Sequence, residues 1–282
     1  MKHSLKITII LVIMFFLAHM IGLYIVHSYV GKAFPFNVEK PKLEKETAYI
    51  PIIITMFIAT MLALLLIRLR AFNLWKLWFF LAVTFCLTIS FGAFIGQFGL
   101  ILALLFAYFK VFRQNVYLHN IGELFLYGGL IAFFAEAFSI LSAYILLVAI
   151  SIYDWYAVNK SKHMIKMAKF QSDAKVFAGL FVPYKVQKGE TKLITGKPVG
   201  KKVSKDTGTN AILGGGDIGF TLLMSAAVML EFNSVAKAII VSLFSTLSLA
   251  FLFYIAEKNK FYPAMPFLTA GVTIGMIVMS FI

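Results

Sequence analysis

Residues 211–224 read AILGGGDIGFTLLM and place one carboxylate, Asp217, between three glycines and an apolar run. A carboxylate at the start of an apolar segment is unusual, because removing a charge from water is costly unless the charge is paired. The meaning of Asp217 therefore depends on the solvent around this segment, which is either water or lipid.

The composition indicates lipid. The chain has 282 residues, of which 61% are hydrophobic and 13% charged, and its mean hydropathy is +0.90. Soluble domains carry about twice that share of charge. Backbone polar groups in a bilayer must pair internally, and the apolar runs of this chain do not alternate as barrel strands do. The sequence therefore predicts an all-α membrane protein, a helix bundle whose surroundings are the lipid bilayer.

Nine apolar segments are long enough to be transmembrane helices. They cover residues 6–29, 48–67, 72–92, 94–112, 118–137, 138–157, 212–231, 236–256 and 262–281. The join between the fifth and sixth is weakly marked, and Ser139 and Ser142 lie near it. The first run is longer than a signal-peptide core, and no A-x-A-like site follows it, so it is predicted to be an uncleaved span.

This pattern divides the chain into three parts: helices one to six in 1–157, a loop in 158–211, and helices seven to nine in 212–282. The loop holds 12 lysines and three acids. Anionic lipid headgroups are sufficient to explain such a basic linker, so no nucleic-acid partner is expected. Within the loop, the apolar sequence KVFAGLFVPYKV is expected to lie on the membrane surface or to pair as a strand.

The distribution of basic residues predicts the orientation. With nine spans, 21 of the 26 Lys and Arg residues fall on the side that holds the N-terminus and the 158–211 loop. Because basic connections stay in the cytoplasm, we expect that side to be cytoplasmic and the C-terminus to lie outside the cell membrane.

Ten of the 12 acidic residues have ordinary positions. Six lie in connections: Glu39, Glu44, Glu46, Asp173, Glu190 and Asp206. Four lie near the predicted span ends, where a carboxylate is expected to reach interfacial water: Glu123, Glu136, Glu231 and Glu257. Only Asp154 and Asp217 remain.

Asp154 and Asp217 are predicted to lie at similar depth on the consecutive sixth and seventh spans. Each is about four to six residues inside its span, or roughly 6–9 Å. Ionisable residues inside a membrane indicate a functional site. Two close carboxylates share one proton, so that the charged group activates a water and the neutral group polarises a peptide carbonyl, as in aspartyl proteases. Glycines at Gly214 and Gly216 would let another backbone approach.

Other interpretations of these residues are weaker but open. Gly214, Gly216 and Gly219 match the G-x-G-x-x-G dinucleotide pattern, but no strand–helix–strand unit surrounds them. The glycines could also serve close helix packing, and paired acids could couple ions in a transporter. The single cysteine, Cys86, is expected to be a buried apolar residue, and the five histidines show no metal-ligand spacing, so no metal or other cofactor is expected.

A third motif opens the last span. The sequence FYPAMPF contains Pro263, Ala264, Met265 and Pro266. One proline at a helix start is ordinary, whereas two prolines three positions apart favour an extended or kinked entry that could present backbone to a substrate. This motif is predicted to lie on the same side as both aspartates.

Together, YD at Tyr153-Asp154, GxGD at Gly214–Asp217 and PAxP at Pro263–Pro266 resemble the presenilin and signal peptide peptidase family. The resemblance covers the whole chain and implies a presenilin-like bundle of nine helices. It also implies that Asp154 and Asp217 are the catalytic pair, and that Pro263, Ala264 and Met265 shape the site. Met265 stands where the family has leucine, and the short chain looks like a prokaryotic, archaeal-type member.

The resemblance implies an intramembrane aspartyl protease whose partners are protein substrates with transmembrane helices. Such a substrate must unwind, and we expect it to pair as a strand with backbone near Pro263–Pro266 and just before Gly214, with Tyr153 near Asp154. A prepilin-type peptidase, with its first aspartate in a cytosolic loop, stays open, as does a transporter or ion-leak channel. The oligomeric state and any partner subunits also stay open.

Overall fold

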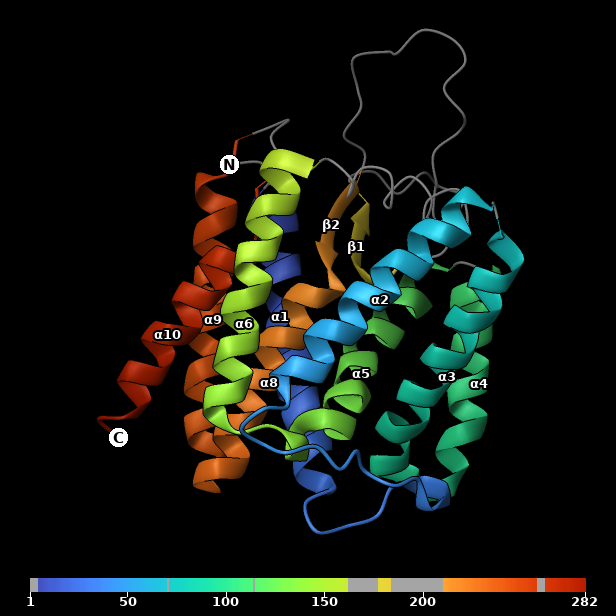
Figure 1. Cartoon of the computed structure of the whole chain (residues 1–282), viewed down its shortest axis with the longest axis horizontal. Coiled ribbons are helices and arrows are strands. Elements are labelled where there is room, and N and C mark those ends of the chain that lie inside the picture. The colour runs from blue at the N-terminus through green and yellow to red at the C-terminus, as the bar shows by residue number, and fades with distance from the viewer. Residues whose placement is uncertain (1–4, 70, 114, 162–176, 184–209, 258–261) are drawn as a thin grey trace, which may run out of the picture.

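The computed structural model describes residues 5–69, 71–113, 115–161, 177–183, 210–257 and 262–282, and these form a helical bundle (Figure 1). The described residues contain nine α-helices, one for each expected span: α1 (Leu5–Ser28), α2 (Tyr49–Arg68), α3 (Phe72–Ile95), α4 (Gly99–Tyr108), α5 (Val116–Phe134), α6 (Ile140–Tyr156), α8 (Gly215–Phe232), α9 (Val235–Ile255) and α10 (Met265–Met279).

The described residues contain seven apolar helical stretches long enough to cross a membrane, and α10 is a shorter apolar helix. One of the seven, Phe72–Arg113, includes both α3 and α4. The chain reverses within it at Gly96, whose φ of +60° suits glycine, and a Cβ on Gly99 would lie 2.6 Å from the backbone nitrogen of Gly92. The fourth helix therefore begins at Gly99 and not at residue 94 as predicted, because the close turn occupies the residues between.

The weakly marked join between the fifth and sixth spans is settled by capping. Helix α5 ends at Phe134 and continues as a short 3-10 turn, Ala135–Ala137. Ser139 then accepts a hydrogen bond from the backbone N–H of Ser142, and the Ser142 hydroxyl accepts one from the backbone N–H of Ser139. This reciprocal cap satisfies two of the amide groups that a helix start leaves unpaired, so α6 begins immediately after Ser139.

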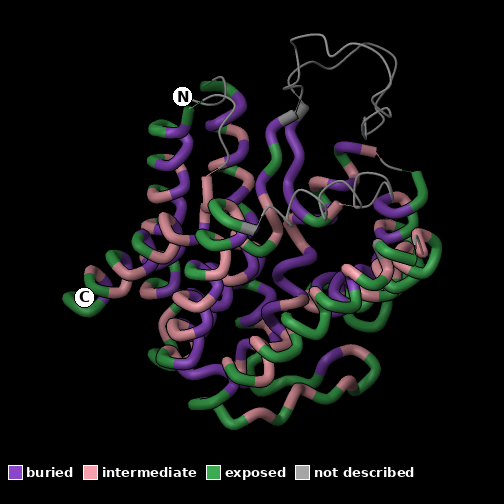
Figure 2. Tube along the Cα trace, turned by 45° about the horizontal axis from the view of Figure 1, so that its top comes forward, coloured by how far each residue is buried: buried purple, intermediate pink, exposed green. Residues whose placement is uncertain are grey.

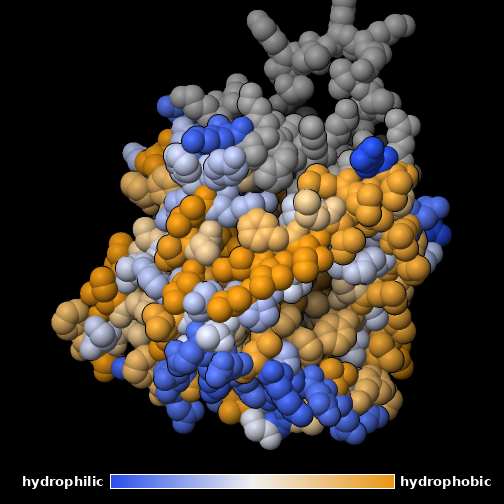
Figure 3. All heavy atoms as spheres, in the orientation of Figure 1, coloured by the Kyte–Doolittle hydropathy of each residue, from blue (hydrophilic) through white to orange (hydrophobic). Residues whose placement is uncertain are grey.

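Helices α1 and α8 pass through the interior, and α2 lies at the periphery (Figures 1 and 2). Within the spanning stretches, 61% of α8 is buried but only 6% of α2. Close packing explains the contrast, since a Cβ on Gly22 of α1 would overlap the side chain of Leu222 of α8. Apolar side chains cover much of the middle of the surface, whereas hydrophilic residues gather below them (Figure 3), as a bilayer would require.

A small antiparallel sheet precedes α8. Strands β1 (Gly179–Pro183) and β2 (Asn210–Gly214) pair in the register Gly179↔Gly214 to Pro183↔Asn210. The strand interpretation of KVFAGLFVPYKV therefore holds for the described residues of that sequence. The predicted start of the seventh helix at residue 212 is wrong, because residues up to Gly214 are extended and belong to β2.

Candidate active site

Asp217 lies in the first turn of α8, immediately after the sheet. Gly214 is the extended N-cap residue of this helix, and its backbone N–H hydrogen-bonds the Asp217 carboxylate. The unpaired amides at a helix N-terminus also favour a negative charge there. Asp217 is thus two residues past the first residue of the helix, nearer its end than the four to six residues predicted, because the strand occupies the positions assigned to helix.

Asp154 lies in the last turn of α6, where it is half-buried. Its Oδ2 accepts a hydrogen bond of 3.2 Å from the backbone N–H of Met265, and the backbone of Ala264 also bonds its carboxylate. Both donors come from the residues at which α10 begins. The end of α6 and the start of α10 therefore hold this carboxylate between them.

The structure brings the two aspartates together from consecutive spanning segments of the described chain. The carboxylate of Asp217 is close enough to that of Asp154 for their charges to interact. Asp154 lies in the last turn of α6, and Asp217 lies in the first turn of α8, which begins where β2 ends (Figure 1). That the two aspartates lie on one side of the membrane at a similar depth stays a prediction.

Polar contacts fix α6 against α10. The hydroxyl of Ser151 bonds that of Thr269, and the Tyr144 hydroxyl bonds Thr273 Oγ1 at 3.0 Å. Hydrogen bonds between helices retain their value in lipid, where water does not compete. These two hydrogen bonds, which do not involve either aspartate, therefore help to set the distance between α6 and α10.

The glycines of the GGGD segment have different surroundings. A Cβ on Gly214 would lie 3.3 Å from Asp217 Oδ2, and one on Gly215 would overlap the Tyr127 hydroxyl. A Cβ on the exposed Gly216 would meet only Phe220, at an ordinary distance of 3.6 Å. Within the described chain, packing thus favours glycine at Gly215, which sequence reasoning did not select, and leaves space beside Gly216.

The remaining predicted site residues lie around Asp154. Met265 is the first residue of α10 and is buried, whereas Pro263, Ala264 and Pro266 are half-buried around it. The ring of Tyr153 packs edge-on against Phe57 of α2, with 6.4 Å between the centroids. Tyr153 therefore joins the loosely packed α2 to the helix that carries Asp154.

A buried polar cluster beside the sheet was missed by sequence reasoning. Glu123 was expected at interfacial water, but it is fully buried and contacts Lys110 and the Tyr127 hydroxyl. The expectation fails because Lys110, from the π-helical turn Phe109–Arg113 before α5, is also buried there and pairs with it. The signal was the four-residue spacing of His119, Glu123 and Tyr127, which places all three on one helix face.

The other acids expected near span ends fit their positions. Glu231 and Glu257 are exposed, and Glu136 forms an ion pair with Lys40. Cys86 is a buried free thiol, as expected. No group of three His, Cys, Asp or Glu side chains suited to a metal ion occurs in the part of the chain that the structure describes.

Comparisons with solved structures find this fold in other membrane proteins. Two crystal forms of a presenilin family intramembrane aspartate protease are similar to this chain. The form in space group C222 has a TM-score of 0.60 at 17% identity and covers 95% of this chain and 94% of its own. The form in space group P2 has a TM-score of 0.61 at 18% identity and covers 96% of each chain.

The family itself is shown by a sequence model. The model described as signal-peptide peptidase, presenilin aspartyl protease matches residues 7–282. The chain therefore belongs to the signal peptide peptidase and presenilin aspartyl protease family, and it is a multi-pass membrane protein. A search of curated protein sequences gives no match.

Proposed function

We propose that this protein is an intramembrane aspartic endopeptidase that hydrolyses peptide bonds within transmembrane segments of other membrane proteins. One observation carries the proposal: Asp154, in the last turn of α6, and Asp217, in the first turn of α8, lie close enough for their charges to interact. Membership of the aspartyl protease family supports the same chemistry.

In the proposed reaction the two carboxylates share one proton. The charged carboxylate removes a proton from a water, which attacks the scissile carbonyl carbon. The protonated carboxyl donates a hydrogen bond to the carbonyl oxygen and stabilises the charge that develops on it. This proton sharing needs only two carboxylates and a water, and it leaves the role of each aspartate open.

The residues at the start of α10 are proposed to orient Asp154 and to dock substrate. The N–H of Met265 bonds one Asp154 oxygen and so limits rotation of the carboxylate. Pro263 and Pro266 restrict the backbone on either side, because proline fixes φ and lacks an N–H. Tyr153, Gly214 and Gly216 are proposed to complete the wall of the site.

A substrate helix must expose its peptide bonds before they can be cut. Backbone groups freed in a membrane cost several kcal/mol each unless they find new partners. We propose that the unwound segment pairs as an added strand with β2 just before Gly214 and contacts the backbone at Pro263–Pro266. Strand addition supplies such partners through main-chain hydrogen bonds.

The test uses the purified full chain in liposomes with a model transmembrane peptide, and product mass is the readout. Wild type is compared with Asp154→Asn and Asp217→Asn, which keep side-chain size and remove the ability to ionise. We expect wild type to cut and each variant to lose essentially all turnover. Equal cleavage by all three proteins would overturn the proposal.

The same liposomes address the alternatives left open by the sequence. An ion flux that depends on both aspartates, without cleavage, would favour the transporter or leak channel. The prepilin-type alternative needs its first aspartate in a cytosolic loop, whereas Asp154 lies within α6. A substrate cut inside its membrane segment would further separate the two peptidase classes.

A further inference from the structure

The two edges of the β1–β2 sheet have different neighbours. In an extended strand the backbone groups of successive residues face opposite sides. Even-numbered residues of the β1 segment face β2, as the hydrogen bond from Gly215 N–H to Ala178 O shows. Odd-numbered residues therefore face the other edge of β1, away from β2.

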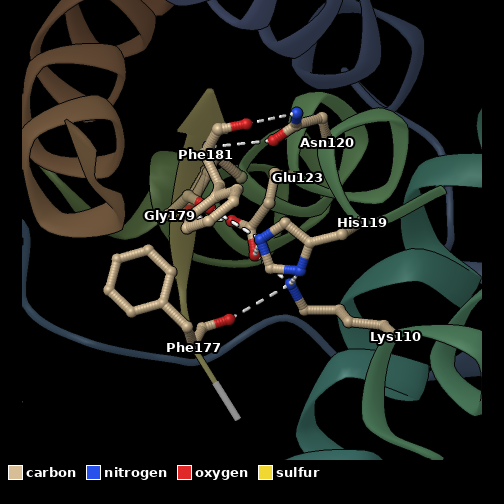
Figure 4. A network of polar contacts seen from close by, with 8 residues as sticks. Lys110, His119, Asn120, Glu123, Phe177, Gly179 and Phe181 are labelled. Atoms are coloured by element: carbon tan, nitrogen blue, oxygen red, sulfur yellow. Dashed lines mark hydrogen bonds and ion pairs between the residues drawn. The ribbon is translucent and has the colours of Figure 1, made fainter. Parts of the chain in front are cut away.

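Side chains from α5 and the π-helical turn before it fill that outer edge (Figure 4). The Asn120 amide donates to Phe181 O at 2.7 Å, and its oxygen accepts from Phe181 N–H at 2.9 Å. His119 Nε2 bonds Gly179 O at 2.8 Å, and Lys110 Nζ donates to Phe177 O at 3.4 Å. Three successive odd-numbered residues of β1 and its approach thus have side-chain partners where a neighbouring strand would lie.

Two of the three side chains, Lys110 and His119, are themselves held in place by a buried polar network. Lys110 and His119 are 3% and 1% exposed, and Lys110 is paired with the fully buried Glu123. Glu123 also accepts a hydrogen bond from the Tyr127 hydroxyl. A buried network whose members are all satisfied is rigid, because breaking any contact leaves a desolvated polar group. This network can therefore fix the position of β1.

The opposite edge of the sheet is formed by β2, and Asp217 follows three residues after the end of this strand. Among the described residues the sheet has two strands, so β2 has no second strand partner. Gly179 and Gly214 are directly opposite each other in the two strands. The Gly179 carbonyl points away from β2, so the backbone groups of Gly214 point away from β1, toward the free edge of β2. Its N–H bonds the Asp217 carboxylate. The uncovered edge of the sheet therefore leads to the proposed catalytic carboxylate.

We propose that Lys110, His119 and Asn120 act as a surrogate strand that closes the β1 edge and so directs a substrate segment to the β2 edge beside Asp217. The three are positioning residues, since none contacts either aspartate in the described structure. The inference rests on the proposed function. It adds a reason why a substrate strand would pair with β2 and not with β1.

The covered edge is tested first without substrate, by residue-resolved amide hydrogen exchange on the purified protein. Phe181 N–H is expected to exchange at least about tenfold more slowly than Ile212 N–H, since Asn120 covers the former and no described strand pairs beside the latter. In Asn120→Leu, which keeps the side-chain size, the Phe181 amide is expected to lose this protection. Equal exchange at Phe181 and Ile212 in wild type would overturn the proposal.

The effect on cleavage is tested by comparing Asn120→Leu with Tyr29→Phe. Asn120→Leu removes two hydrogen bonds to the Phe181 backbone, and Tyr29→Phe removes one buried hydrogen bond to the Ile89 carbonyl, which lies in α3 and outside the sheet. We expect Asn120→Leu to lower kcat by about ten- to a hundredfold and to add new product masses, because a displaced strand misplaces the scissile bond. Tyr29→Phe is expected to keep the wild-type product pattern.

The outcomes separate the two proposals. If Asn120→Leu matches Tyr29→Phe in kcat and product masses while wild type cuts through both aspartates, the surrogate strand is wrong and the protease stands. If wild type does not cut, the proposed function and the substrate-directing role fail together. In that case the exchange rates at Phe181 still decide whether the β1 edge is closed.

Discussion

The backbone N–H of Met265 donates a hydrogen bond of 3.2 Å to the carboxylate of Asp154, although 111 positions separate the two residues. This contact joins the last helix of the chain to one of the two proposed catalytic aspartates. The motif at Pro263–Pro266 thereby acquires a physical role, because its backbone orients a carboxylate whose side chain would otherwise rotate. The same contact makes the motif testable by changing a single amide.

Met265→Pro is expected to impair cleavage strongly, because proline lacks the N–H that bonds Asp154 and restricts the preceding Ala264. Helix α10 should still form, since proline is tolerated at a helix start. Met265→Leu keeps the N–H and the apolar volume, and it should cleave far faster than Met265→Pro. Turnover of a model transmembrane peptide is the measurement, and equal turnover of the two variants would refute the role of the amide.

Gly215→Ala is expected to destabilise the protein by about 1–3 kcal/mol, the usual cost of adding a methyl group to a packed position. The new Cβ would overlap the Tyr127 hydroxyl, which is itself held by Glu123. Gly216→Ala is the matched comparison, since its Cβ would meet only Phe220 at an ordinary distance. Thermal unfolding in detergent should show a clearly lower midpoint for Gly215→Ala, and identical midpoints would contradict this packing.

Lys110→Met is expected to cost about 3–5 kcal/mol of stability, because it leaves the buried Glu123 carboxylate without a counter-charge. Adding Glu123→Gln removes that charge and keeps an acceptor for the Tyr127 hydroxyl, so the double variant should be more stable than Lys110→Met alone. Unfolding midpoints of the wild type, both single variants and the double variant give the coupling between the two sites. Simple additivity would show that the pair is not coupled.

The orientation predicted from basic residues can be tested with introduced cysteines. Cys86 is the only native cysteine and is buried, so it should stay unlabelled. A membrane-impermeant maleimide added to intact cells should label Lys42→Cys, in the connection expected outside. It should label Lys160→Cys, in the 158–211 loop expected in the cytoplasm, only after the membrane is opened. The reverse pattern would invert the proposed orientation and the side from which substrates are cut.

The sequence predicted much of the helical framework because a bilayer imposes a simple rule. Apolar runs favour helices, so each expected span overlaps a helix among the described residues, although α4 and α10 have only 10 and 15 residues and seven stretches are long enough to cross a membrane. Prediction of the boundaries failed where local structure competes with hydropathy. The stretch 72–113 was predicted to break at residue 93, whereas the chain turns at Gly96, where the positive φ suits glycine.

Asp154 and Asp217 could be selected from the sequence because acids inside spans are rare, whereas the surrogate strand could not. Lys110 lies inside the predicted span 94–112 and drew no prediction, and Glu123 was expected near an interface. Lys110 also meets the β1 segment at the Phe177 carbonyl, 67 positions away, and such a contact between distant segments is not visible in the sequence.

Composition and hydrophobic run length thus determined the class of protein and its helical segments, since the solvent acts on each segment separately. The tertiary structure alone decided which distant groups meet: the Met265 amide with Asp154, and Asn120 with the edge of β1. These contacts are short-ranged and directional, so they exist only when several helices are packed at fixed distances. No single segment of the sequence contains that information.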